Sequence, residues 1–255
     1  MANSLDVMST FRLDGRVVIL TGASSGLGAR FAQVVDALGA TVVLAARRLD
    51  RIEALAASLA NSVAVACDVG EAGANEALVA TAVEKFGRLD GLIANAGITK
   101  TVPATRESVE DFTRVVAIDL VAPFALAKAA LPHLRATKGT IVMVASAAGH
   151  GSTSLLPQAG YVGAKTGLVG LTRELAFQWA RYSVRVNALC PGMFPSEMTA
   201  ELTGNENAAA LYSATVPLGR CGVEHELDGA LAFLLSDASS YMTGQSLIVD
   251  GGGTM

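Results

Sequence analysis

The sequence has few charged residues, few aromatic residues and no basic run. Charged residues make up 16% of the 255 residues and aromatic residues 5%, whereas 51% are hydrophobic. The formal net charge is −4, from 19 basic and 23 acidic residues. This net charge and the absence of a basic run argue against nucleic acid and anionic membranes as partners.

Cysteine and histidine are equally scarce. Cys67, Cys190 and Cys221 are odd in number and widely spaced in apolar surroundings, which indicates buried thiols in a reducing compartment and not a disulfide framework. The 3 histidines have no ligand spacing to a cysteine or to one another, so no metal site is predicted. No 18-residue window is continuously apolar without charge or proline, and the first ten residues carry no targeting signal. We therefore expect a cytoplasmic protein.

Short β-branched runs alternate with longer alanine-rich segments along the chain, which is typical of βαβ units around a parallel sheet. The length fits a single α/β domain over residues 1–255, preceded by a loose tail at 1–12. The strands are predicted at 16–20, 41–46, 62–67, 91–94, 140–145, 184–189 and 246–249, and helices at 29–38, 109–131 and 160–179.

The first predicted strand runs directly into a glycine-rich turn, TGASSGLG, and then into a helix. Backbone N–H groups at a helix start attract a phosphate, and residues without a β-carbon allow it to approach. Tight packing alone is the alternative for such a turn, but the strand, turn and helix together favour a dinucleotide site. The expected contacts are Gly22, Ser24, Ser25, Gly26, Leu27 and Gly28.

The second predicted strand ends at Ala46 and is followed by Arg47 and Arg48. A site for NAD usually presents a carboxylate here, whereas a site for NADP offers cations to the 2′-phosphate. Guanidinium matches phosphate in geometry and charge. We therefore predict NADP(H) as the cofactor, with NAD(H) as the alternative. Arg48 and Arg51 could instead be solvated residues opening the next helix, and for Arg51 that interpretation is favoured.

Tyr161 and Lys165 lie four residues apart in a predicted helix, which places them a turn apart on one face. A cation held beside a phenol stabilises the phenolate and makes it usable as an acid or base near neutrality. A surface helix that happens to carry one Tyr and one Lys is the alternative. The other motifs of the chain, described below, favour a catalytic role for this pair.

Polar and small residues follow the other predicted strands at their carboxyl ends, where ligands bind in open α/β sheets. Asp68 could contact the coenzyme or cap the helix that follows. Asp119 lies amid apolar residues of a predicted helix, and a buried carboxylate needs a partner. The remaining strand-end candidates are Val69, Asn95, Ala96, Gly97, Ser146, Pro191 and Gly192.

Taken together, these motifs resemble the short-chain dehydrogenase/reductase family. Its order and spacing are matched, over about residues 11–253, by Thr21-Gly22-x-x-x-Gly26-x-Gly28, Asp68, Asn95-Ala96-Gly97, Ser146, Tyr161-x-x-x-Lys165, Pro191-Gly192 and Asp250-Gly251-Gly252. The resemblance implies a three-layer Rossmann fold with a seven-stranded parallel sheet flanked by helices. It also implies hydride transfer between a nicotinamide and a carbonyl or secondary alcohol substrate.

By the same resemblance, Tyr161 is the general acid in reduction, Lys165 supports it and holds the nicotinamide ribose, and Ser146 orients the substrate oxygen. Phe194 and Ser196 join the coenzyme contacts, with Ser196 in place of the usual threonine. Asp119 replaces an asparagine that many members use in a proton relay. A main-chain contact there would tolerate aspartate, whereas a side-chain contact would change the relay, so Asp119 is a catalytic candidate.

The substrate class is left open between a 3-oxoacyl thioester, a small ketone or secondary alcohol, a steroid-like polycycle and a sugar derivative. The loop His150 to Pro157 and a lid at about 195–216 are expected to line the substrate pocket. The alternative functions are an NAD-dependent alcohol or sugar dehydrogenase and a non-catalytic NADP-binding regulatory protein. A small-residue helix face at Gly163, Ala164, Gly167 and Gly170, together with the resemblance, predicts a homotetramer, with a dimer as the alternative.

Overall fold

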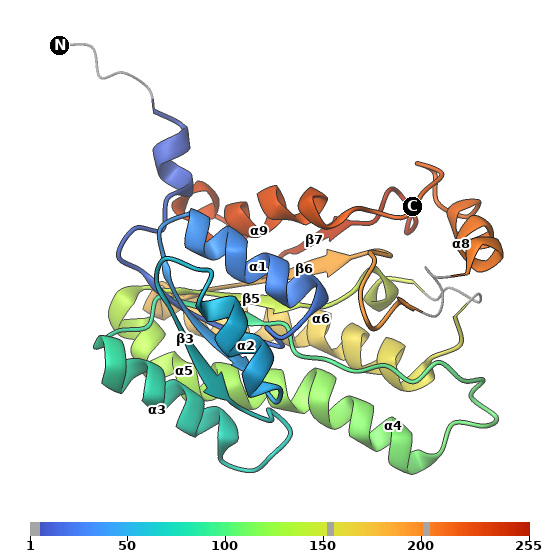
Figure 1. Ribbon diagram of the computed structural model, residues 1–255, viewed down its shortest axis with the longest axis horizontal. Coiled ribbons are helices and arrows are strands. Elements are labelled where there is room, and N and C mark those ends of the chain that lie inside the picture. The colour runs from blue at the N-terminus through green and yellow to red at the C-terminus, as the bar shows by residue number, and fades with distance from the viewer. Residues whose placement is uncertain (1–5, 152–155, 201–204) are drawn as a thin grey trace.

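A computed structural model describes residues 6–151, 156–200 and 205–255. Within these residues, one parallel sheet has the strand order β3-β2-β1-β4-β5-β6-β7 (Figure 1). This confirms the predicted seven-stranded α/β fold. The strands are β1 (Val17–Thr21), β2 (Thr41–Ala46), β3 (Ser62–Ala66), β4 (Gly91–Ala94), β5 (Thr140–Val144), β6 (Arg185–Pro191) and β7 (Ser246–Val249).

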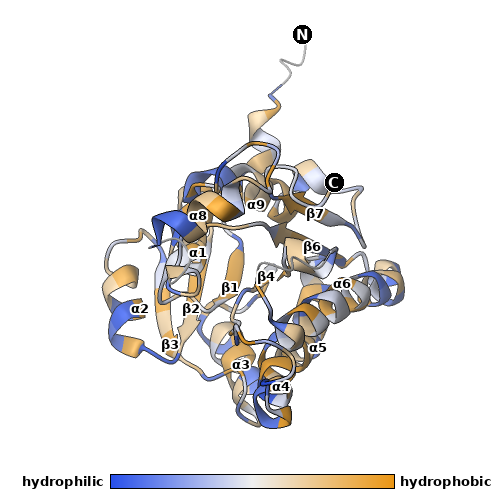
Figure 2. Ribbon diagram, turned by 90° about the vertical axis from the view of Figure 1, so that its right-hand side faces the viewer, coloured by the Kyte–Doolittle hydropathy of each residue, from blue (hydrophilic) through white to orange (hydrophobic). Residues whose placement is uncertain are grey.

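Helices cover both faces of the sheet (Figure 2). One face packs against α1 (Gly26–Ala37), α2 (Leu49–Ala56) and α9 (Asp228–Leu235). The other packs against α3 (Ala74–Phe86), α5 (Ala122–Thr137) and α6 (Ala159–Trp179). The helix α4 (Val109–Val116) continues into α5 through the π-helical turn Ala117–Val121, and α8 (Glu206–Ser213) lies near the carboxyl end of the sheet.

The strands are continuous apolar runs because both faces of the sheet are covered. Every residue of β1 is buried. Its side chains alternate between the two layers: Ile19 joins the core under α3, α5 and α6, whereas Val18 and Leu20 join the core under α1 and α9. The predicted strands agree with the observed ones to within two residues at each end.

Several predicted boundaries and environments differ from the structure. The helix α1 begins at Gly26, three residues before the predicted start, because the glycine-rich turn is itself the first helical turn. The predicted tail contains a 3₁₀ helix, Met8–Phe11, in which no residue is buried. Cys67 and Cys190 are buried as predicted, but Cys221 is partly exposed. The predicted lid contains α8, and its residues 201–204 lie outside the described ones.

One helical run in the described part of the chain, Val109–Thr137, is long and apolar enough to cross a membrane by length and composition. Core helices of soluble proteins meet the same test. Leu126, Ala127, Ala130 and Leu134 of this run are fully buried against the sheet. We therefore assign the run to the core of the domain.

Candidate active site

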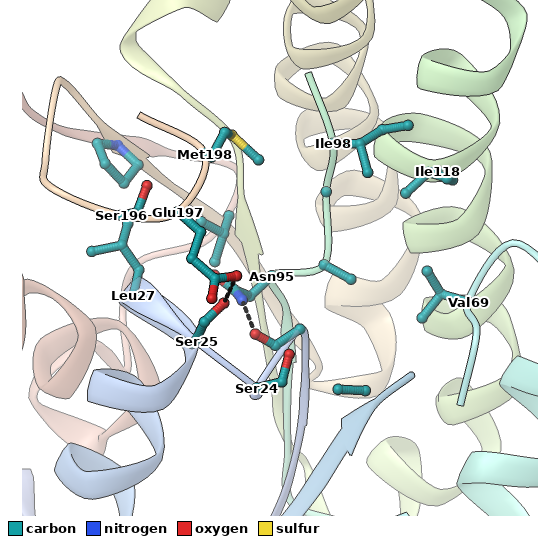
Figure 3. Close-up of a pocket in the computed structure, with 18 of the residues that line it drawn as sticks. Ser24, Ser25, Leu27, Val69, Asn95, Ile98, Ile118, Ser196, Glu197 and Met198 are labelled. Atoms are coloured by element: carbon teal, nitrogen blue, oxygen red, sulfur yellow. Dashed lines mark hydrogen bonds between the residues drawn. The ribbon is translucent and has the colours of Figure 1, made fainter. Parts of the chain in front are cut away.

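The strand order reverses between β1 and β4, and ligands bind at the carboxyl ends of the strands at such a point. A cleft of about 400 Å³ lies there (Figure 3). It brings together every residue that the sequence predicts to contact the coenzyme: Gly22, Ser24, Ser25, Gly26, Leu27, Gly28, Arg47, Arg48, Asp68, Val69, Asn95, Ala96, Gly97, Tyr161, Lys165, Pro191, Gly192, Phe194 and Ser196. It also contains Ile98 and Ile118, which the sequence did not indicate, and three residues of the predicted lid at 195–216: Glu197, Met198 and Thr199.

The glycine-rich turn fits a pyrophosphate because it cannot accept side chains. Gly22 has φ +69°, and a β-carbon there would lie 2.8 Å from Nδ2 of Asn95. At Gly28 a β-carbon would lie 2.1 Å from the carbonyl oxygen of Gly22. Among the described residues, no side chain caps the N-terminus of α1. The backbone N–H groups of its first turn are therefore free to bind an anion.

Asn95 joins the ends of β1 and β4 through hydrogen bonds. Its Nδ2 donates to the carbonyl oxygen of Thr21 at 2.9 Å. The hydroxyl of Thr21 in turn accepts hydrogen bonds from the backbone N–H groups of Asn95 and Ala96, both at 3.1 Å. The Asn95 side chain therefore shapes the cleft at the point where the strand order reverses.

Arginine side chains gather where β2 ends. The guanidinium of Arg48 donates to the hydroxyls of Ser24 and Ser25, with distances of 2.8 Å from Nη2 to each, and to Glu197 at 2.9 Å. Arg51 donates to the same carboxylate at 2.5 Å. Arg51 lies in the first turn of α2 with its side chain 46% exposed, as its interpretation as a solvated residue implies, and it also pairs with Glu197.

Asp68 does not cap a helix. Its Oδ1 accepts from the backbone N–H of Gly70 at 3.1 Å, and α3 begins several residues later with Gly73 as its N-cap. Its Oδ2 lies 4.0 Å from Nη1 of Arg47, whose side chain is 60% exposed. Asp68 lines the cleft, and its contact with the coenzyme stays a prediction.

Tyr161 and Lys165 lie on one face of α6, and Nζ of Lys165 is 5.5 Å from the centre of the Tyr161 ring. Nζ donates to the carbonyl oxygen of Val144 at 3.0 Å. Burial of the Lys165 side chain opposes its charge, but Asp119 and Tyr161 outweigh this effect and raise the pKa of Lys165. Lys165 is therefore an ammonium ion at neutral pH.

Asp119 is the partner that holds this ammonium. It is fully buried in the π-helical turn, and its Oδ2 lies 3.1 Å from Nζ of Lys165. The angle of this contact is outside hydrogen-bond geometry, and Oδ2 has no hydrogen-bond partner in the described part of the chain. Oδ1 accepts from the backbone N–H of Ile98 at 2.8 Å. Burial raises the pKa of Asp119, and Lys165 and Ile98 counter that rise.

The contact of Asp119 with Lys165 is made by the side chain, so its carboxyl group lies directly beside the Lys165 ammonium. The part of Asp119 in a proton relay stays a prediction. The π-helical turn distorts the regular backbone spacing at this position, and such turns are frequent at functional sites.

Ser146 follows β5, and its Oγ accepts from the backbone N–H of Ala148 at 3.1 Å. Because the oxygen is the acceptor in this bond, its proton can be donated to a ligand. A second cavity of about 310 Å³ adjoins the coenzyme cleft. Ser146, Tyr161, Gly192, Met198 and Thr199 line both cavities. The two catalytic hydroxyl candidates therefore stand where the cavities meet.

The second cavity has a mixed lining. Leu156, Met193 and Val216 contribute apolar surface, and Gln158 accepts from the Thr99 hydroxyl at 3.0 Å. The predicted lid contributes Met198, Ala208, Tyr212 and Thr215, and the predicted loop contributes Leu156, with its residues 152–155 outside the described ones. The cavity therefore suits a substrate that carries both apolar and polar groups.

Known proteins resemble this chain in sequence and in fold. A family model described as Enoyl-(Acyl carrier protein) reductase matches residues 22–254. The chain belongs to the short-chain dehydrogenase/reductase family. The fold and the family predicted from the sequence are thus confirmed, and this short-chain dehydrogenase/reductase is an oxidoreductase that acts on CH–OH groups.

Individual relatives cover nearly the whole chain. The meso-2,3-butanediol dehydrogenase of Serratia marcescens is 36% identical over 245 residues, which cover 95% of this chain and 96% of the relative. A short-chain type dehydrogenase/reductase from Mycobacterium marinum superposes with a TM-score of 0.93 at 31% identity, covering 98% and 99% of the two chains. A gluconate 5-dehydrogenase from Burkholderia cenocepacia in complex with NADP and tartrate gives 0.90 at 30% identity, covering 96% and 98%.

Proposed function

We propose that this short-chain dehydrogenase/reductase transfers a hydride between NADP(H) and a small ketone or secondary alcohol, with Tyr161 as the acid in reduction and the base in oxidation. The supporting observation is that Ser146 and Tyr161 line both the coenzyme cleft and the adjoining cavity. The Lys165–Asp119 pair lies directly behind them. The bound nicotinamide supplies or accepts the hydride.

The protein's part in reduction follows from where charge develops. As a carbonyl carbon gains hydride, negative charge grows on its oxygen, and the hydroxyls of Ser146 and Tyr161 donate to that oxygen more strongly in the transition state than before it. Tyr161 then gives up its proton. The ammonium of Lys165 stabilises the phenolate that is left, and Asp119 keeps Lys165 charged and in place.

The residues at the end of β2 favour NADP(H) over NAD(H). Ala46 provides no carboxylate for a ribose 2′-hydroxyl, and Arg47 and Arg48 line the cleft beside it. A phosphate on that ribose would meet guanidinium groups of matching geometry. The Burkholderia cenocepacia gluconate 5-dehydrogenase, which superposes on this chain, was crystallised with NADP.

Replacing Arg47 with aspartate should lower the preference for NADPH over NADH about tenfold to a hundredfold. This is the effect expected from the loss of one hydrogen bond between charged groups. The ratio of kcat/KM for the two coenzymes measures this. Arg181→Asp is a matched control, because Arg181 follows α6 at the opposite end of the sheet. An unchanged ratio in Arg47→Asp would remove Arg47 from the phosphate site.

The size of the second cavity favours compact substrates. Its volume of about 310 Å³ is at the lower end of the range for ligand sites. A small hydroxyketone or diol fits within it with room to spare, and a 3-oxoacyl thioester could insert its reacting end. A rigid steroid-like polycycle would need nearly the whole of this volume and is disfavoured. The presence of Ser146, Tyr161 and Lys165 around the same cleft disfavours a purely regulatory protein.

The experiment follows loss of NADPH absorbance with a carbonyl panel: a small hydroxyketone, an acetoacetyl thioester, an aryl ketone, a keto sugar and a steroid ketone. We expect turnover with one or more of the compact compounds and none with the steroid. Equal turnover with NADH would support the NAD-dependent alternative. NADPH binding without turnover of any compound would support the regulatory alternative.

For the assembly and the location, we propose a cytoplasmic homotetramer, with a dimer as the alternative. Two residues of the predicted small-residue face of α6 pack inside the subunit: Ala164 is buried, and Gly167 packs on Leu120. A β-carbon placed at Gly170 would meet no described atom within 4 Å, and the neighbouring Phe177 is 85% exposed. This part of α6 is therefore open to another copy of the chain. A monomer in sedimentation at micromolar concentration would contradict the proposal.

A further inference from the structure

Glu197 lies in the segment that follows β6, yet its side chain reaches across the cleft to the glycine-rich turn (Figure 3). The hydroxyl of Ser25 donates to its Oε2 at 2.9 Å. Arg48 donates to Oε2 at 2.9 Å and Arg51 to Oε1 at 2.5 Å. Arg51, Arg48 and Ser25 hold the pKa of Glu197 at about 2, so the carboxylate is charged at every physiological pH.

The groups around this carboxylate form a complete anion site. Two guanidinium groups and a hydroxyl converge on it, and Ser25 is the N-cap residue of α1. A helix N-terminus adds favourable potential for an anion. The same cluster at the end of β2 is where the proposed function places the coenzyme's 2′-phosphate. Two anions can therefore occupy the same site: the carboxylate of Glu197 and the 2′-phosphate of the coenzyme.

We propose that Glu197 occupies the 2′-phosphate position and that NADP(H) binds by displacing it, so that Glu197 limits the preference of this enzyme for NADP(H) over NAD(H). This inference rests on the proposed function. The phosphate is the stronger ligand, because it carries more charge than a carboxylate and has more acceptor oxygens for the two guanidinium groups.

The two coenzymes differ in what they must displace. NADPH must break the contacts of Glu197 with Arg48, Arg51 and Ser25, whereas NADH has no 2′-phosphate and leaves them in place. The Glu197 side chain is 53% exposed, so its ion pairs are of the weak, solvent-screened kind. Together, these ion pairs should make the affinity for NADPH about threefold to tenfold lower than it would be without the Glu197 carboxylate.

Glu197→Gln tests the inference, because glutamine keeps the size of the side chain and removes its charge. Calorimetry should show NADPH and the fragment 2′-AMP binding about threefold to tenfold more tightly to the variant. NADH and 5′-AMP, which lack the 2′-phosphate, should bind as they do to the native protein. Glu226→Gln is a matched control: it breaks an exposed pair with Arg220 outside the cleft and should change none of the four affinities.

A double-variant cycle locates the effect. In an Arg48→Gln background, the gain in NADPH affinity produced by Glu197→Gln should shrink. One of the two guanidinium groups for which Glu197 and the phosphate compete is then absent. Equal weakening of NADPH and NADH in Glu197→Gln would overturn the inference, because Glu197 would then close over either coenzyme. Unchanged affinities would overturn it as well.

The outcomes also separate this inference from the proposed function. Native protein that prefers NADPH, with a Glu197→Gln variant that behaves identically, would refute only the role of Glu197. Native protein that binds neither NADPH nor 2′-AMP would refute both.

Discussion

Replacing Tyr161 with phenylalanine should lower the turnover number by about a hundredfold to ten-thousandfold, the value of a positioned acid or base. Phenylalanine keeps the ring beside Lys165 but removes the proton that the substrate oxygen must receive. NADPH binding should change by only about twofold, since the aromatic ring that lines the cleft is kept and the lost hydroxyl is the one that faces the substrate cavity. Stopped-flow turnover and NADPH fluorescence titration measure the two quantities.

Tyr241→Phe is the control for this prediction. Tyr241 is fully exposed and lines neither cavity, so the loss of its hydroxyl should leave turnover unchanged. Substantial turnover by Tyr161→Phe would assign the proton transfer to another group. A parallel loss of NADPH binding would instead give Tyr161 a mainly structural part in the cleft.

Replacing Asp119 with alanine should destabilise the fold by about 3–5 kcal/mol, because it leaves the buried ammonium of Lys165 without its counter-charge. It also removes the acceptor for the backbone N–H of Ile98. Because the pKa of Lys165 is raised in the fold, its contribution to stability is complete at neutral pH and is lost as the pH rises through that raised value. Urea unfolding at pH 7 measures the difference.

A double variant separates the charge from the packing. Asp119→Leu with Lys165→Met removes both buried charges, and most of the stability lost in Asp119→Ala should return while activity stays absent. Asp119→Asn keeps an acceptor for Ile98 and should lose less stability than Asp119→Ala. If Asp119→Ala were as stable as the native protein, the ion pair would be too weak to position Lys165.

The sheet could be predicted from the sequence because its central strands are buried on both faces. Such strands must be largely apolar runs, and β2 and β4 were predicted to the residue. The partly buried β7 was also predicted to the residue. The glycine-rich turn was equally predictable, since a close approach like that of Gly28 to Gly22 has no room for a side chain.

The long segment before β5 shows where local patterns fail. Its apolar periodicity predicted one helix, but the backbone widens into a π-helical turn at Ala117–Val121 before α5 begins. Within this turn Asp119 contacts Ile98 and Lys165, which come from other parts of the chain. Propensity and periodicity describe neighbours in sequence and carry no information about such partners.

The sequence by itself indicated the fold through its alternation of apolar strands and alanine-rich helices. The resemblance of its ordered motifs identified the family and pointed to Ser146, Tyr161 and Lys165. Only the tertiary structure decided that Asp119 pairs with Lys165 and that Glu197 occupies the arginine cluster at the end of β2. These contacts join segments that are distant along the chain, and their geometry is fixed only when the helices and loops pack around the carboxyl end of the sheet.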